Sequence, residues 1–141
     1  MALQEFEPIF ELLEEIYEGK TRKGLDKPAD QHPHDVVRFS FLEVLADPLK
    51  TVRLLKLGLL HDVVENGGFD LPALESRIDL TPEESRLLAI LSPNVGHPDG
   101  LDYWLGIISS EDALIVKLGD IIADLVDLVA WVSDEGGFCK E

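Results

Sequence analysis

The sequence predicts a single all-α domain, a compact bundle of helices. Apolar residues recur at helical spacing in several segments, as at Phe6, Ile9 and Leu13 of the first. The alternation that is typical of amphipathic strands never continues for more than a few residues. No repeat, linker or low-complexity run divides the 141 residues, a length that one hydrophobic core can hold. We therefore expect residues 1–141 to form one domain.

Proline and glycine residues indicate the helix boundaries in the first half of the chain. A first helix is expected over Leu3–Glu18, followed by an ordered loop over Gly19–Gln31. His32-Pro33 suits the start of a second helix that runs to about Ala46, because proline is favoured at the first helical position. Asp47-Pro48 starts a third helix in the same manner. This one is expected to continue through His61 to about Asn66, where Gly67-Gly68 ends it.

Capping residues mark the helices of the second half. Asp70 is expected to cap a short helix that ends near Arg77. Thr81-Pro82-Glu83-Glu84 is typical of a capping box and opens a helix that Ser92-Pro93 ends. The remaining elements are a loop over Pro93–Gly100, a short helix near Leu101–Ser109 and a long helix over about Ser110–Ser133.

Composition excludes several classes of partner. Twelve basic against 28 acidic residues leave a net charge of −16, which repels nucleic acids and anionic lipid, so neither is expected as a partner. The most apolar stretch, Ala113–Val132, carries four charges and is a poor membrane span. The single cysteine, Cys139, leaves no internal disulfide, and no basic segment leads into an apolar run, so a cytoplasmic location is expected. An anionic nucleotide would need a local basic patch or a metal ion.

The last helix combines charge with an apolar surround. Lys117, Asp120, Asp124 and Asp127 fall within one arc of roughly 80°. Apolar residues flank that arc on both sides, which is typical of a buried helix, and a buried carboxylate is too costly to keep without a cation. The alternative is that the arc is the solvated face of a surface helix.

The third helix carries a second unusual group. His61, Asp62 and Glu65 lie among core-like leucines and valines, and Glu65 follows His61 by four residues, so the three side chains are expected to lean toward one space. Gly58, one turn upstream, would leave room there for a ligand. A hydrogen-bonded core histidine is the alternative.

His32 completes a possible ligand set with His61, Asp62 and Asp120, which come from three expected helices. Two imidazoles and two carboxylates suit a divalent transition metal of intermediate hardness, such as Mn²⁺. A metal held in this way lowers the pKa of bound water and generates a nucleophile near neutral pH.

The sequence around these residues contains three ordered motifs. The first has Arg22 and Lys23, then Pro28, then His32-Pro33; the second runs from Thr51 to Leu59-Leu60-His61-Asp62-Val63-Val64-Glu65-Asn66; the third is Lys117-Leu118-Gly119-Asp120. In this order they resemble the HD-domain metal-dependent phosphohydrolases, and most closely the hydrolase domain of the RelA/SpoT stringent-response enzymes and their small stand-alone relatives. The resemblance spans roughly Tyr17 to Leu128, most of the chain.

The resemblance implies a function and a role for each matching residue. It implies that His32, His61, Asp62 and Asp120 are the ligands of the metal, most simply Mn²⁺, and that Glu65 and Asn66 occupy the catalytic positions, with Glu65 orienting or deprotonating the attacking water. Arg22 and Lys23 would contact the nucleotide, for which Lys20, Arg22 and Lys23 form a basic island unless they are simply a solvated loop. Tyr103 would line the pocket or pack. The implied reaction removes the 3′-pyrophosphate of guanosine tetraphosphate or a related nucleotide.

Three departures from that pattern concern the substrate site. Asn66 replaces an aspartate and cannot act as a carboxylate base, Ile121 replaces an arginine, and Asp124 replaces an asparagine and adds a negative charge near the substrate. Hydrolysis of another nucleotide or phosphate ester, or a weakly active helical module that senses a nucleotide, therefore remain alternatives. Trp104 and Trp131 fit helix packing or a contact in a homo-oligomer better than base stacking.

Overall fold

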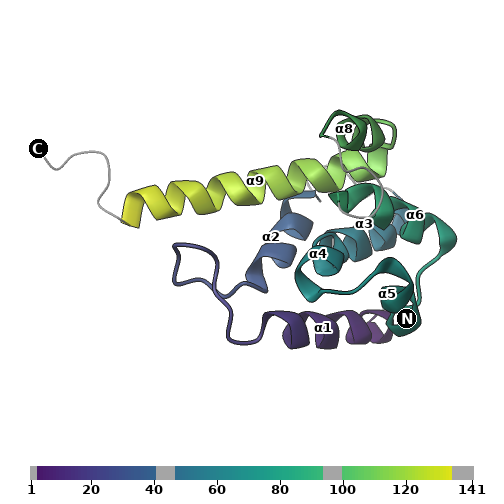
Figure 1. Cartoon of the computed structure of the whole chain (residues 1–141), viewed down its shortest axis with the longest axis horizontal. Helices are drawn as coiled ribbons and strands as arrows, with labels where there is room; N and C mark the ends of the chain where they lie inside the picture. The colour runs from purple at the N-terminus through teal and green to yellow at the C-terminus, as the bar shows by residue number, and fades with distance from the viewer. Residues whose placement is uncertain (1–2, 41–46, 94–99, 135–141) are drawn as a thin grey trace, which may run out of the picture.

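Helices are the regular elements of the described residues, which are 3–40, 47–93 and 100–134 of the computed structural model (Figure 1). They are α1 (Leu3–Tyr17), α2 (Gln31–Ser40), α3 (Pro48–Leu60), α4 (Val63–Gly67), α5 (Leu71–Arg77), α6 (Pro82–Leu91), α8 (Gly100–Ile108) and α9 (Glu111–Asp134). Within these ranges the only extended pairing is an isolated antiparallel bridge between Thr21 and Pro28. The all-α prediction is confirmed. The expected extension of the second helix beyond Ser40, most of the Pro93–Gly100 loop and Cys139 lie outside the described residues.

The helix boundaries follow the capping signals. Asp47 accepts hydrogen bonds from two backbone N–H groups in the first turn of α3, and Asp70 accepts one at the start of α5. Thr81 and Glu84 form the expected capping box, in which each side chain accepts a hydrogen bond from the other residue's backbone N–H. Gly68, with φ 70°, adopts the left-handed conformation that ends α4.

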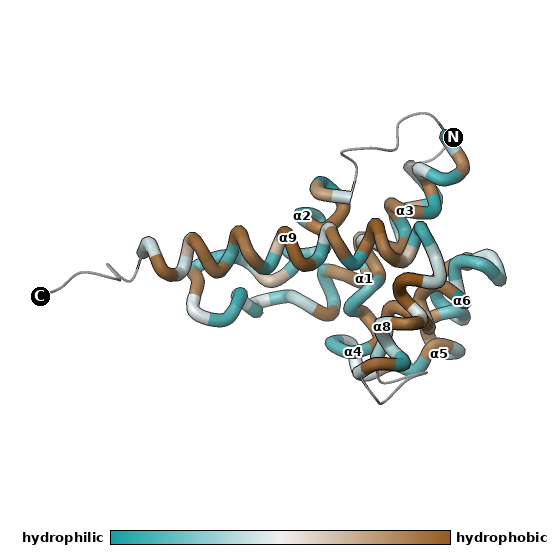
Figure 2. The backbone as a smooth tube through the Cα atoms, turned by 90° about the horizontal axis from the view of Figure 1, so that it is seen from above, coloured by the Kyte–Doolittle hydropathy of each residue, from teal (hydrophilic) through white to brown (hydrophobic). Residues whose placement is uncertain are grey.

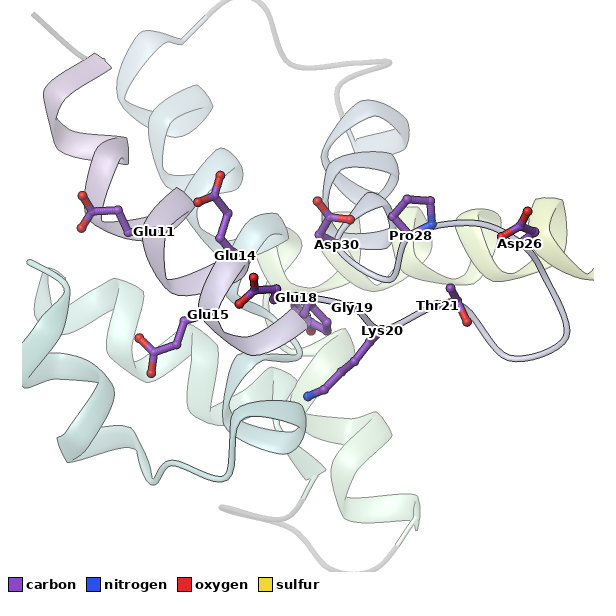
Figure 3. A pocket seen from close by; sticks show the side chains of 11 residues that line it. Glu11, Glu14, Glu15, Glu18, Gly19, Lys20, Thr21, Asp26, Pro28 and Asp30 are labelled. Atoms are coloured by element: carbon purple, nitrogen blue, oxygen red, sulfur yellow. The ribbon is translucent and has the colours of Figure 1, made fainter.

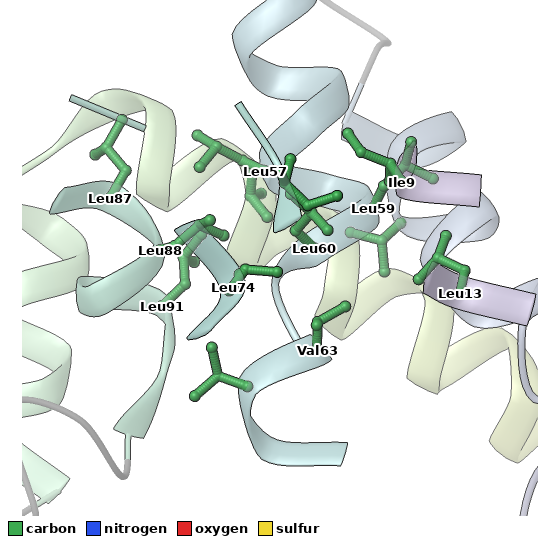
Figure 4. Packing of buried hydrophobic residues seen from close by; sticks show 14 of the residues in the cluster. Ile9, Leu13, Leu57, Leu59, Leu60, Val63, Leu74, Leu87, Leu88 and Leu91 are labelled. Atoms are coloured by element: carbon green, nitrogen blue, oxygen red, sulfur yellow. The ribbon is translucent and has the colours of Figure 1, made fainter. Parts of the chain in front are cut away.

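The core lies where α1, α3, α5 and α6 meet. Figure 4 shows aliphatic side chains of these helices and of α4 packed together, and most of them are fully buried. The labelled members are Ile9, Leu13, Leu57, Leu59, Leu60, Val63, Leu74, Leu87, Leu88 and Leu91. Because His61 and Asp62 lie between the α3 and α4 residues of this cluster, core packing fixes their position.

The long helix α9 packs across α2 at Gly119. A Cβ atom on Gly119 would overlap the hydroxyl oxygen of Ser40 and would lie 2.8 Å from the carbonyl oxygen of Val36. Only glycine allows this approach. Beyond α2, the second half of α9 runs beside the loop that joins α1 to α2, as Figure 1 shows. Among the described residues, none of the helices combines the length and apolar character needed to cross a bilayer.

The third helix is shorter than the sequence predicted. It ends at Leu60, His61 and Asp62 form a turn, and α4 begins at Val63, so the expectation of one helix through Asn66 is wrong. His61 Nδ1 donates a hydrogen bond to the carbonyl oxygen of Gly58 at 2.8 Å, which satisfies a carbonyl that a continuing helix would use. Glu65, four residues after His61, is exposed, whereas His61 is buried.

Gly58 has a different role from the one expected. A Cβ atom there would lie 2.9 Å from Cγ2 of Val37 and 3.5 Å from its Cα. The missing side chain therefore makes room for α2 and not for a ligand, and it brings the helix that carries His32 close to the helix that ends at His61.

The orientation of α9 decides between the alternatives considered for its charged arc: the arc holds buried carboxylates, as expected, and is not the solvated face of the helix. Asp120 and Asp127 are buried, whereas apolar residues that flank the arc, including Leu118, Leu125 and Val129, are 50–66% exposed. The acidic arc thus faces the protein, and the apolar side faces outward. In Figure 2 hydrophobic segments continue along α9 to its last turns.

Candidate metal centre

Four side chains from three separate parts of the chain converge between α2, α3, α4 and α9. His32 is the second residue of α2, His61 and Asp62 form the turn between α3 and α4, and Asp120 lies in the middle of α9. Asp120 Oδ1 is 3.0 Å from Nε2 of His32 and 3.5 Å from Nε2 of His61. Asp62 Oδ2 is 3.3 Å from Nε2 of His61 and 3.7 Å from Nε2 of His32. We call these four residues the His/Asp cluster.

Three members of the His/Asp cluster have the geometry of a metal site. His32, His61 and Asp120 are buried, and each offers a ligand atom within 4.8 Å of the others, so they could hold a metal ion. In the neutral imidazole of His61, the bond from Nδ1 to Gly58 leaves Nε2 with a lone pair directed at the cluster. This buried Nε2 has no hydrogen-bond partner within the described part of the chain. A lone pair facing two carboxylates is unfavourable unless a cation or a proton lies between them.

Lys117 forms an ion pair with the second carboxylate oxygen of Asp120. Its ammonium donates to Asp120 Oδ2 at 2.6 Å and lies 5.8 Å from the centre of the Tyr103 ring. Burial alone would lower the pKa of Lys117, but the Asp120 carboxylate raises it, so the lysine stays charged. Oδ1 of Asp120 is therefore held toward the imidazoles, and Lys117 positions a candidate ligand, a role that sequence analysis did not assign.

The electrostatics of the cluster favour a positive charge at its centre. Burial by itself would lower the pKa of His61, but Asp120 and Asp62 raise it to about 10. Burial would raise the pKa of Asp120, and the two imidazoles with Lys117 hold it far below its usual range instead. The protein without metal therefore keeps a proton where a cation would bind.

A cavity of about 240 Å³ opens beside the His/Asp cluster. Its lining joins two cluster residues to side chains of the α1–α2 loop, to the end of α1 and to α4: Tyr17, Lys20, Thr21, Arg22, Lys23, Ala29, His32, Asp62 and Asn66. Three of these carry positive charge and one carries negative charge, which suits an anionic group. Asn66 Nδ2 donates to the Tyr17 hydroxyl at 3.1 Å, which fixes the amide at the wall.

A larger cavity of about 720 Å³ lies on the other side of the loop and shares Tyr17, Lys20 and Thr21 with the smaller one. Figure 3 shows its acidic lining from α1 and the loop, to which Glu11, Glu14, Glu15, Glu18, Asp26 and Asp30 contribute against the single Lys20. An anion that approaches this surface meets repulsion. The cationic cavity beside the cluster is therefore the one suited to a phosphate.

The loop is held on α9 by a network of ion pairs. Arg22 donates to Asp124 at 2.5 Å and to Asp127 at 2.8 Å, and Lys27 donates to Asp127 and to Asp35, both at 2.6 Å. Burial opposes the charge of Arg22, but its two acceptors raise its pKa. The guanidinium that was expected to contact a nucleotide is thus already paired with protein carboxylates. Sequence analysis missed Lys27 and gave Asp127 no partner, although Asp127 follows Asp120 by seven residues on the same helix face.

The remaining predicted site residues differ in their exposure and in whether they line the cavity beside the cluster. Asp124 is 57% exposed, and its Oδ1 is 3.7 Å from Nδ1 of His32. Tyr103 is buried, donates to the carbonyl oxygen of Leu91 at 3.3 Å and is not part of the cavity lining, so it packs behind Lys117. Glu65 is exposed and does not line the cavity either. Arg22, Lys23 and Asn66 do line it.

In comparisons with known proteins, no protein-family model, curated protein or solved structure matches this chain.

Proposed function

We propose that the protein is a metal-dependent phosphohydrolase and that the His/Asp cluster holds its metal, with Mn²⁺ as the ion that best suits the ligands. The observation that carries the proposal is the unpartnered Nε2 of His61, directed at Asp62 and Asp120. Two neutral imidazoles and two carboxylates are a donor set for a divalent transition metal, and the fit requires no rearrangement of Asp120, which Lys117 already orients. The order of ligands along the chain is that of the HD-domain hydrolases.

The substrate class follows from the cavity beside the cluster. Lys20 and Lys23 line this cavity next to His32 and Asp62. Neither lysine forms an ion pair within the described residues, so both positive charges are available to an anion. A phosphate or pyrophosphate held there would lie against two candidate ligands. We propose the guanosine alarmones as substrates, with removal of the 3′-pyrophosphate, because the flanking motifs resemble the RelA/SpoT hydrolase domain.

The position of each residue indicates its role in the proposed reaction. A metal held by His32, His61, Asp62 and Asp120 would supply Lewis acidity and would lower the pKa of a bound water, the nucleophile for phosphorus. Lys20 and Lys23 hold the phosphate, and the Asn66 amide donates a hydrogen bond at the cavity wall. Because Asn66 cannot accept a proton and Glu65 is exposed, Asp62 is the one carboxylate on the described cavity wall. Proton removal is therefore expected to be the weakest part of the mechanism.

That weakness favours a second candidate, a nucleotide-sensing module with little turnover. It would bind the same anion through the same cavity, with Asn66 as a hydrogen-bond donor. Turnover distinguishes the two candidates. A metal-dependent hydrolase of another nucleotide or phosphate ester differs from the first candidate only in its substrate.

The test is product release from a nucleotide panel in the presence of Mn²⁺. The panel contains guanosine tetra- and pentaphosphate, deoxynucleotides and a generic phosphodiester, and bound metal is measured in parallel. His61→Ala is compared with His34→Ala, because His34 is exposed on α2 and lies outside the cluster. We expect pyrophosphate release from the alarmones by the wild type and by His34→Ala, and none by His61→Ala. Metal binding without turnover of any compound would refute the hydrolase and leave the sensor.

A further inference from the structure

The outward side of α9 presents an apolar row to solvent. Its residues are between 36% and 66% exposed and none is charged: Leu118, Ile121, Ile122, Leu125, Leu128 and Val129. Three acidic residues of the same helix, Asp120, Asp124 and Asp127, contact α2 and the loop instead. The helix is therefore amphipathic with its apolar side away from its own domain.

The spacing of this row is that of a helix that packs on another helix. Leu118 and Leu125 are seven residues apart, as are Ile121 and Leu128, and Ile122 and Val129. These are the a, d and e positions of consecutive heptads, the apolar stripe that a helix turns toward a neighbour. Within the part of the chain that the structure describes, no helix covers this side of α9, since the side chains of the row remain exposed.

A second apolar row lies on α8, which packs against the beginning of α9. Leu101, Trp104, Leu105 and Ile108 are 45–73% exposed at spacings of three and four residues. The ten residues of the two rows, each about half exposed, amount to on the order of 900 Å². The largest apolar patch of an ordinary monomer covers roughly 300–600 Å².

We infer that the apolar face of α9 and α8 is the interface of a homodimer. The area matches the roughly 800 Å² that each partner contributes to a stable protein–protein interface. The net charge of −16 on each copy opposes association at long range, and a face without charged side chains adds no further repulsion at close contact. A two-fold axis near Ile122 and Leu125 sets the α9 helices of both copies antiparallel, so that each row covers the other.

The test is the mass of the protein in solution. We expect sedimentation or light scattering to give twice the 15.7 kDa of one chain from micromolar to sub-millimolar concentration. Leu125→Glu places a charge in the middle of the face, at a side chain that is 55% exposed and dispensable for the fold. It should raise the Kd of the dimer by roughly 30-fold or more.

Leu49→Glu is the matched control, since Leu49 is 81% exposed on α3 and belongs to neither apolar row, and this variant should remain dimeric. Circular dichroism of both variants reports the fold, and Ile122→Gln repeats the test with a milder change. A wild-type protein that is monomeric throughout this range, or a dimer that survives both changes on α9, would overturn the inference. The measurement is independent of metal and substrate, so it stands apart from the proposed function.

Discussion

The contact between Gly119 and α2 makes a quantitative prediction about the substitution Gly119→Ala. The added Cβ would overlap the Ser40 hydroxyl, which can rotate away only by giving up its 2.8 Å hydrogen bond to Val36. It would also lie 2.8 Å from the carbonyl oxygen of Val36 and 3.1 Å from the backbone nitrogen of Ser40, and these atoms move only with the helix. The two helices must separate by a few tenths of an ångström.

The expected cost combines two opposing effects. Overpacking of a tight contact costs about 1–3 kcal/mol, and replacing glycine by alanine inside a helix returns up to about 1 kcal/mol. The two effects together span about 0–3 kcal/mol, and we expect the free energy of unfolding to fall by a value near the middle of that range, about 1–2 kcal/mol, or roughly 3–8 °C in Tm for a domain of this size. Since the next residue is Asp120, whose Oδ1 is 3.0 Å from His32, affinity for Mn²⁺ should fall by about tenfold.

Denaturant unfolding in the presence of a chelator measures the first effect, and calorimetric titration with Mn²⁺ measures the second. Gly100→Ala is the control, because a Cβ at Gly100 meets nothing within 4 Å and the residue does not have positive φ. It should be neutral or slightly stabilising. If Gly119→Ala is as stable as the wild type and binds metal equally well, α2 and α9 are not in the contact described, and the reasoning fails.

Three further predictions concern charge and proton transfer. Asn66→Asp adds a carboxylate to the cavity wall and should raise kcat about tenfold or more if proton removal limits the reaction; unchanged kcat would contradict that assignment. Asp124→Asn releases one of the two acceptors of Arg22 and should lower KM for an anionic substrate, whereas Arg22→Ala should raise it; KM values that move in the same direction would argue against a substrate role for Arg22. In the presence of a chelator, the stabilisation from protonated His61 should be complete below pH 6.5 and should disappear as the pH rises toward about 10, because the folded state holds the proton more tightly than the unfolded state. Denaturant unfolding measures the free energy of unfolding across this range. A free energy of unfolding that rose with pH would refute the link between the His61 proton and stability.

Local signals predicted the helices well because capping is a local interaction. Asp70, Thr81 and Gly68 act within four residues of their own positions, and the structure has them in the expected roles. The convergence of His32, His61 and Asp120 also agrees with the sequence, although it was expected from the order of motifs and not from periodicity.

Other features depend on contacts that periodicity does not contain. The charged arc of α9 was visible as an arc, but only packing decides which side of a helix faces the domain. A two-residue turn at His61-Asp62 leaves the apolar pattern of α3 and α4 nearly unchanged, so the break was not predicted. Gly58 was assigned to a ligand because the approach of Val37 comes from another helix. The pairing of Lys27 with Asp127 joins residues 100 positions apart.

That long separation sets the order in which the protein is completed during synthesis. His32 and Asp120 are 88 residues apart, and Arg22 and Asp127 are 105 apart. A ribosome that has released α1 to α6 has produced His32, His61 and Asp62, but not the helix that closes the cluster or the carboxylates that fasten the loop. Non-local contacts of this kind form late, since a long chain segment must be closed before they contribute. A nascent chain therefore lacks the complete His/Asp cluster until its last helix has emerged and docked, and truncation of α9 before Asp120 removes the cluster while leaving most of the hydrophobic core intact.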